Sequence, residues 1–348
     1  MNRLVAVFQL NRKGFNLVRG LTIVAVLIVP LVVLSLIGEE KYWLSVSFAA
    51  LFVALSDPGG DYGIRLRGMI GVGVIGALLT ALGFAIGGGP WGWVLVAAFA
   101  VTVISGLSLK FGTHRFTAAL LLNVWFLIAL SIPAGEHLDL SRSGWWDQAL
   151  AWLVGSALWI AFTLVMWLIR GQESQASHVP EIPGDMTVTK LTRQVILFTL
   201  IRAFAVGIAV AIAFGLHIPN ADWMPVATLV AMKASLQQAT LVAEQRLVGA
   251  LIGAVVATIF LMAVDNKHAL EVVIILLGAF AASFRAVNYA IYCAAVAGAV
   301  LIGMDLPHPT NLTAEAHRVL FTLAGVGIAL VVMGLASQLQ KPEVTPTP

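Results

Sequence analysis

The chain has 348 residues, of which 60% are hydrophobic and only 11% are charged. Soluble globular domains carry about 25% charged residues, so this composition excludes a soluble fold and predicts an all-α, polytopic transmembrane helix bundle. The net charge of +3 comes from basic residues spread along the chain, which membrane topology explains, so we expect no nucleic acid partner. The only cysteine is Cys293, which excludes an intrachain disulfide.

Apolar runs alternate with polar breaks from residue 18 to residue 335. Six runs lie at 18–38, 42–56, 68–88, 90–107, 116–133 and 145–169. Six more lie at 198–217, 223–235, 247–264, 269–284, 288–304 and 317–335. Because a bilayer core of about 30 Å needs roughly 20 apolar residues of helix, we expect about 12 spans. The predicted organisation is a first membrane half over 1–170, a polar cytoplasmic linker over 171–190, a second membrane half over 191–339 and a polar tail over 340–348.

The distribution of lysine and arginine predicts the orientation of the chain. With the N-terminus inside a bacterial inner membrane, the cytoplasmic side carries about four times as many of these residues as the outside. Arg12, Lys110 and Arg170 then lie on the cytoplasmic side, whereas Lys41 and Lys267 lie outside. We therefore expect both termini to be cytoplasmic.

The two series of runs resemble each other in sequence order. The entry to the first run reads LVRGL at 17–21, and the entry to the seventh reads LIRAF at 200–204. Trp43 opens the second run and Trp223 opens the eighth. An even number of spans in each half makes both halves enter the membrane in the same direction, so we predict a parallel 6+6 internal repeat.

The second and eighth runs are too short to cross a membrane as regular helices. Their apolar parts extend over 43–55 and 223–232, and polar segments follow both. Short hydrophobic segments at matching positions of two halves indicate a transporter's binding site, because polar backbone at membrane depth is tolerated where it lines a cavity. Tilted, partly interfacial helices beside ordinary loops are the alternative interpretation.

Three cations lie at the ends of these short segments. Arg65 and Arg246 begin the matched sequences RLRG and RLVG, and Lys233 directly follows the apolar part of the eighth run. Two arginines that face one cavity would bind an organic carboxylate through their forks of donors. The alternative is that the arginines anchor helices at the cytoplasmic surface and that Lys233 reaches the interface.

Aromatic residues complete the predicted substrate-binding set. Arg285 with Tyr289 would place a cation and an aromatic face near the cytoplasmic mouth, which suits an aromatic carboxylate. An interfacial aromatic belt explains the tyrosine equally well. Trp43 and Trp223, at the starts of the two short segments, belong to the same set.

The acidic residues of the two short segments are Asp57, Asp61 and Glu244. Carboxylates in this setting titrate during proton coupling or form salt bridges with neighbouring arginines. Simple salt bridging is the favoured interpretation.

These features resemble a known family. A tryptophan opens each short segment. An arginine follows in the sequence Arg246-Leu-Val-Gly249-Ala-Leu-Ile-Gly253, which has a second copy at Arg65-Leu-Arg-Gly68. This pattern is similar to the fusaric acid resistance protein-like family, which is also called the aromatic acid exporters. Plant aluminium-activated malate transporters are similar in their membrane part. The resemblance covers about 20–335 and implies a six-span repeat, export of aromatic or other organic acids and a periplasmic adaptor protein. Larger family members carry a sizeable cytoplasmic domain where this sequence has the short linker, which makes a homodimer, as in the malate transporters, the expected assembly.

The sequence thus predicts an inner-membrane efflux transporter of organic, in particular aromatic, carboxylate anions, driven by the membrane potential or by a proton gradient. A passive organic-anion channel and a membrane scaffold without transport are the alternatives. No P-loop or GxSxG sequence occurs, so we expect neither an enzyme nor a cofactor, and we expect no metal site.

Overall fold

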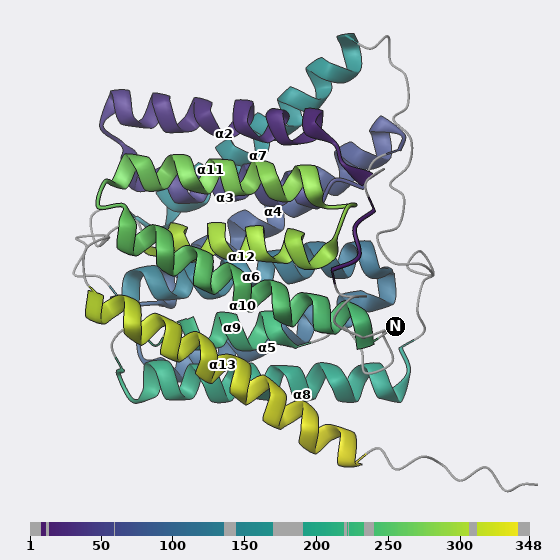
Figure 1. The fold of residues 1–348 in the computed structure, drawn as a ribbon, viewed down its shortest axis with the longest axis vertical. Coiled ribbons are helices and arrows are strands. Elements are labelled where there is room, and N and C mark those ends of the chain that lie inside the picture. Colours follow the sequence, from purple (N-terminus) through teal and green to yellow (C-terminus); the bar gives the residue numbers. More distant parts are fainter. Residues whose placement is uncertain are drawn as a thin grey trace, which may run out of the picture.

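The computed structural model describes residues 8–11, 14–58, 60–135, 144–169, 191–218, 221, 223–232, 240–305 and 312–339. All regular elements in this part of the chain are helices. Within it, seven helices are long and apolar enough to cross a membrane. Figure 1 shows the helices side by side in one bundle, with α2 (Leu17–Ile37) and α8 (Arg193–Val210) near opposite edges. The predicted all-helical, multi-pass membrane fold is confirmed.

The twelve predicted apolar runs each coincide with one α-helix. After α2, the first half forms the 3-10 helix η2 (Glu40–Tyr42), α3 (Trp43–Leu55), α4 (Tyr62–Ile86), α5 (Trp91–Leu107), the 3-10 helix η3 (Ser108–Phe111), α6 (Thr113–Gly135) and α7 (Trp145–Ile169). After α8, the second half forms the π-helical turn η4 (Ala211–Gly215), α9 (Trp223–Ala231), α10 (Thr240–Ala263), α11 (Lys267–Phe284), α12 (Tyr289–Asp305) and α13 (Leu312–Leu339). The predicted linker and tail lie outside the described residues.

The two segments predicted to be short form short helices. At 1.5 Å per residue, the 13 residues of α3 extend about 20 Å and the 9 residues of α9 about 14 Å, against a bilayer core of about 30 Å. Ser56 ends α3 directly before Asp57-Pro58, and a residue before proline is disfavoured in a helix. The next helix, α4, begins at Tyr62, before the predicted residue 68, because the Asp61 side chain caps it by accepting a hydrogen bond from the backbone N–H of Gly63.

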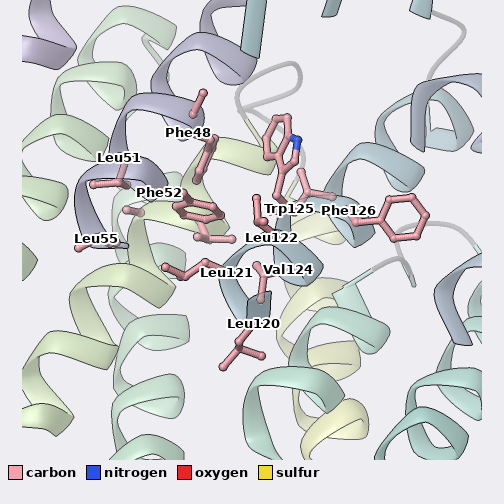
Figure 2. Close-up of a cluster of buried hydrophobic side chains, with 14 of the residues drawn as sticks. Phe48, Leu51, Phe52, Leu55, Leu120, Leu121, Leu122, Val124, Trp125 and Phe126 are labelled. Atoms are coloured by element: carbon pink, nitrogen blue, oxygen red, sulfur yellow. The ribbon is translucent and has the colours of Figure 1, made fainter. Parts of the chain in front are cut away.

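Helices α3 and α6 form the centre of the bundle. Twelve of the thirteen residues of α3 are buried, and α6 is buried over most of its length. Figure 2 shows the side chains of α3 gathered against those of α6. The ring centroids of Phe48 and Trp125 lie 5.5 Å apart, and those of Trp125 and Trp152 of α7 lie 4.9 Å apart. Aromatic side chains of α6 and α7 therefore pack around the short helix α3.

Two of the packing contacts among α2 to α7 have counterparts among α8 to α13. In the first half α3 packs on α7 and α4 packs on α6, as α9 packs on α13 and α10 packs on α12 in the second. The halves contact each other mainly through α2 with α11 and through α5 with α8. The repeat predicted from the sequence matches α2 with α8 and α5 with α11. It therefore relates the contact between α2 and α11 to the contact between α8 and α5.

Helices α10 and α12 approach closely at two glycines. A Cβ atom on Gly249 would lie 2.5 Å from the backbone oxygen of Ala290, and one on Gly253 would lie 2.5 Å from that of Ala294. Helix association in lipid depends on such close packing of small residues. The second-half motif Arg246-Leu-Val-Gly249-Ala-Leu-Ile-Gly253 therefore contains a helix contact.

Gly253→Leu should destabilise the folded chain, because leucine would push α10 away from α12. Overpacking costs about 1–3 kcal/mol, and the apparent melting temperature in detergent should fall accordingly. Gly71→Leu is the matched control, since nothing lies within 4 Å of a Cβ at that glycine of α4. Equal melting temperatures for the two variants would contradict this close contact.

Candidate functional site

The carboxyl end of α3 is held by two side chains from other helices. The guanidinium of Arg285, directly after α11, donates from Nη1 to the backbone oxygen of Leu55 at 3.0 Å. His114 Nε2, at the start of α6, lies 2.8 Å from the backbone oxygen of Ser56. The last carbonyls of a helix lack partners within the helix and carry partial negative charge, so a cation is stabilising there. An arginine of the second half thus caps the short helix of the first.

The carboxyl end of α9 has a similar arrangement. Arg202 of α8 is 1% exposed, and its Nη2 donates to the backbone oxygen of Leu229, in the last turn of α9, at 3.4 Å. Its guanidinium carbon lies 5.4 Å from the centre of the Phe116 ring of α6. Each of the two short helices therefore ends beside a buried arginine.

Asp57 and Arg65 form a buried ion pair directly after α3. Arg65 donates from Nε to Oδ1 of Asp57 at 2.9 Å and from Nη2 to Oδ2, which is the two-pronged geometry that guanidinium and carboxylate favour. Both residues are less than 10% exposed. The pair compensates the charge of Arg65 within the protein.

Two further arginines lie near this pair. Arg19, near the start of α2, is close enough to interact electrostatically with Asp57 and Arg65, and Arg285 is close enough to interact with Arg19. Burial, and then repulsion from Arg19, lower the pKa of the Arg285 guanidinium to about 10. Arg285 therefore stays protonated at neutral pH. Tyr289 and Tyr292, whose rings lie 5.8 Å apart, are within electrostatic reach of Arg285.

These side chains lie at one end of the bundle, and α6 connects them. His114 contacts the end of α3, and Phe116, two residues later, contacts Arg202. We call this group the arginine layer, which consists of Arg19, Asp57, Arg65, Arg202 and Arg285. The layer brings four arginines and the Asp57 carboxylate to the ends of the two short helices.

The structure separates the predicted aromatic residues. Tyr289 begins α12 beside the arginine layer, whereas Trp43 begins α3, 12 residues or about 18 Å from Leu55 at its other end. Trp223 likewise begins α9, ahead of the turn that Arg202 contacts. Both tryptophans are 2% exposed. The two tryptophans therefore lie at the amino ends of α3 and α9, whereas the arginines lie at the carboxyl ends.

Other predicted residues have separate positions. Asp61 is exposed and caps α4. Lys233 lies outside the described residues, and the side chains of Arg246 and Glu244 on α10 also lie outside them. In the described part of the chain, no three metal-ligand side chains gather into a group that could hold an ion.

The substrate-binding set predicted from the sequence did not include Arg202 or Arg19. The signal for Arg202 was present, because it is the one charge inside the seventh apolar run, and an ionisable residue within a span marks a functional site by default. The role of His114 had no signal in the sequence, since only the packing of α6 against the end of α3 reveals it.

Comparison with known proteins supports the family resemblance. Residues 192–332 match the family described as fusaric acid resistance protein-like, and the predicted resemblance is thereby confirmed over the second half of the chain. No curated protein and no solved structure matches the chain.

Proposed function

We propose that this chain exports organic anions, aromatic carboxylates in particular, across a bacterial inner membrane, and that the arginine layer binds the anion. The observation that carries the proposal is the gathering of buried arginines beside the last turns of the two short helices, α3 and α9. Charge removed from water is costly unless it is paired, and intramembrane charges mark substrate pathways. A carboxylate bound beside these guanidiniums would form charge-assisted hydrogen bonds with them.

The arrangement of the arginines favours a carboxylate ligand. Arg65 already forms a two-pronged pair with Asp57, so we assign contact with the ligand to Arg19, Arg202 and Arg285. The stacked rings of Tyr289 and Tyr292 lie beside Arg285 and offer an aromatic surface. An aromatic carboxylate fits both features.

The pathway would run along α3 and α9 between two parallel halves of six spans each, over 1–170 and 191–339. The matched packing of α3 with α7 and of α9 with α13, and the arginine beside the last turn of each short helix, support this repeat. Half-length helices that end inside a bundle are typical of binding sites in transporters built from repeats.

Both termini and the arginine layer would face the cytoplasm, where lysine and arginine are concentrated in membrane proteins. An inside-negative membrane potential contributes about 2.3 kcal/mol per charge per 100 mV and expels an anion. The family resemblance adds a homodimer and a periplasmic adaptor protein as proposed partners.

The test is anion flux through the purified protein in liposomes. We use phthalate, an aromatic carboxylate that carries two negative charges at neutral pH and does not cross bilayers unaided, and malate as its aliphatic counterpart. We expect phthalate uptake well above that of empty liposomes, and a smaller rate for malate. Uptake equal to that of empty liposomes for every anion tested would refute transport and favour a membrane scaffold. A phthalate current that is independent of any proton movement would favour a passive channel.

A further inference from the structure

The opposite end of the bundle contains a buried carboxylate, Glu271, near the start of α11. It is 1% exposed, although the surrounding helix sequence is strongly apolar. Its hydrogen-bond partner among the described residues is His268, whose Nδ1 lies 2.8 Å from Oε2 of Glu271. An ionisable group buried inside a membrane span is costly and marks function, and the sequence prediction did not include this one.

His268 connects the buried carboxylate to water. The side chain of His268 is 60% exposed, and its second ring nitrogen, Nε2, lies 3.9 Å from Oε1 of Glu40 in η2. Glu40 also accepts a hydrogen bond from Lys267 at 2.6 Å, and this bond holds the pKa of Glu40 below its ordinary value. Glu40 therefore stays ionised in the pH range where a histidine titrates, next to the exposed edge of His268.

Glu271 and Arg285 lie on one face of the same helix. Ile275, Gly278 and Ala282 lie between them on this face, at alternating spacings of four and three residues. All five residues are buried. Fourteen residues separate Glu271 from Arg285, or about 21 Å of helix. This face packs on α2 and α3, since a Cβ on Gly278 would lie 3.6–3.7 Å from atoms of Ile23, Leu27 and Leu51. One helix therefore carries the buried carboxylate at one end and an arginine of the layer at the other.

We propose that Glu271, loaded through His268, is the site at which a proton gradient is coupled to anion export. This inference rests on the proposed function. A proton from water binds Nε2 of His268, and the proton on Nδ1 passes to Oε2 of Glu271. The products are a neutral carboxyl group and a neutral imidazole. The reverse transfer releases the proton.

Protonation removes the negative charge of Glu271 that attracts His268. The contact between η2 and the start of α11, to which His268 contributes, is thereby weakened. Because Arg285 directly follows α11, a change at the Glu271 end of this rigid helix can shift Arg285 and so alter the equilibrium between conformations of the arginine layer. The charged or titratable groups on the surrounding elements are Glu39, Glu40, Lys41 and Tyr42 between α2 and α3, and Asp265 and Lys267 at the start of α11. Asp305, at the end of α12, has a side chain outside the described residues.

The test uses Glu271→Gln in proteoliposomes, with Asp265→Asn as the matched control because Asp265 is an exposed carboxylate six residues before Glu271. Phthalate accumulation driven by a pH gradient is measured at clamped membrane potential, together with luminal pH from an enclosed dye. Phthalate–phthalate exchange without a gradient is measured in the same preparations. We expect Glu271→Gln to lose gradient-driven accumulation by about tenfold or more but to keep exchange, and His268→Gln to lose accumulation in part.

Each alternative outcome has a separate meaning. Gradient-driven accumulation that is unchanged in Glu271→Gln would overturn the proton role, and so would loss of exchange in a variant that still elutes as a folded protein. Wild-type flux that responds to the membrane potential and ignores the pH gradient would also overturn it, while leaving anion transport intact. Absence of any wild-type phthalate flux would instead refute the proposed function itself.

Discussion

Replacing both Arg202 and Arg285 with methionine should lower phthalate flux by about a hundredfold, and each single replacement should lower it by about tenfold. Methionine keeps an unbranched apolar stem in the buried site but removes the guanidinium. Because Arg285 donates to the last turn of α3 and Arg202 to the last turn of α9, the double variant removes the cation from both short helices. Initial rates of phthalate uptake at fixed membrane potential measure the effect.

The control for this pair is Arg67→Met, which removes an exposed arginine of α4 two residues after Arg65. A lysine at position 202 or 285 should recover only part of the flux, because its compact ammonium lacks the two-pronged fork. If the arginines bind phthalate, the concentration for half-maximal flux should rise in those single variants that still elute as folded protein. A double variant that transports at the rate of Arg67→Met would remove both residues from the site.

The helices could be predicted from the sequence because lipid leaves the backbone few options. Inside a bilayer every backbone N–H and C=O group must be paired within the protein, so an apolar run forms a helix almost regardless of its detailed sequence. Local chemistry set the boundaries that hydropathy missed. Asp61 caps α4 and starts it ahead of the predicted residue, which places Arg65 inside a helix.

The site was harder to predict because its residues come from three helices, α2, α4 and α8, and from the segments that directly follow α3 and α11. Sequence proximity grouped Trp43 with Arg65, yet α3 separates them by most of its length of about 20 Å. The same proximity linked Arg65 with Asp57, and there the chain turns back so that the two side chains meet. Arg202 was absent from the predicted site, because only the packing of α8 on α9 brings it to a helix end.

Replacing Arg65 with alanine should destabilise the protein by about 3–5 kcal/mol, since it leaves the Asp57 carboxylate buried without its partner. Removing both members of the pair should be far less costly than removing Arg65 alone, because no uncompensated charge then remains. Thermal unfolding in detergent for the two single variants and the double alanine variant gives the coupling free energy of the pair. An Arg65→Ala variant as stable as Arg67→Ala would contradict a strong buried pair.

The same variants separate a structural role of Arg65 from a role in anion binding. If Arg65 mainly neutralises Asp57, the double alanine variant should fold and keep most of its phthalate flux, since Arg19, Arg202 and Arg285 remain. If Arg65 also binds the anion, the double variant should fold and yet transport as poorly as the variants at Arg202 and Arg285. The 2.9 Å contact between Nε and Oδ1, with its second prong, already engages the fork of donors that a carboxylate ligand would need. We therefore expect the first result, and with it a site whose positive charge comes from α2, α8 and the end of α11.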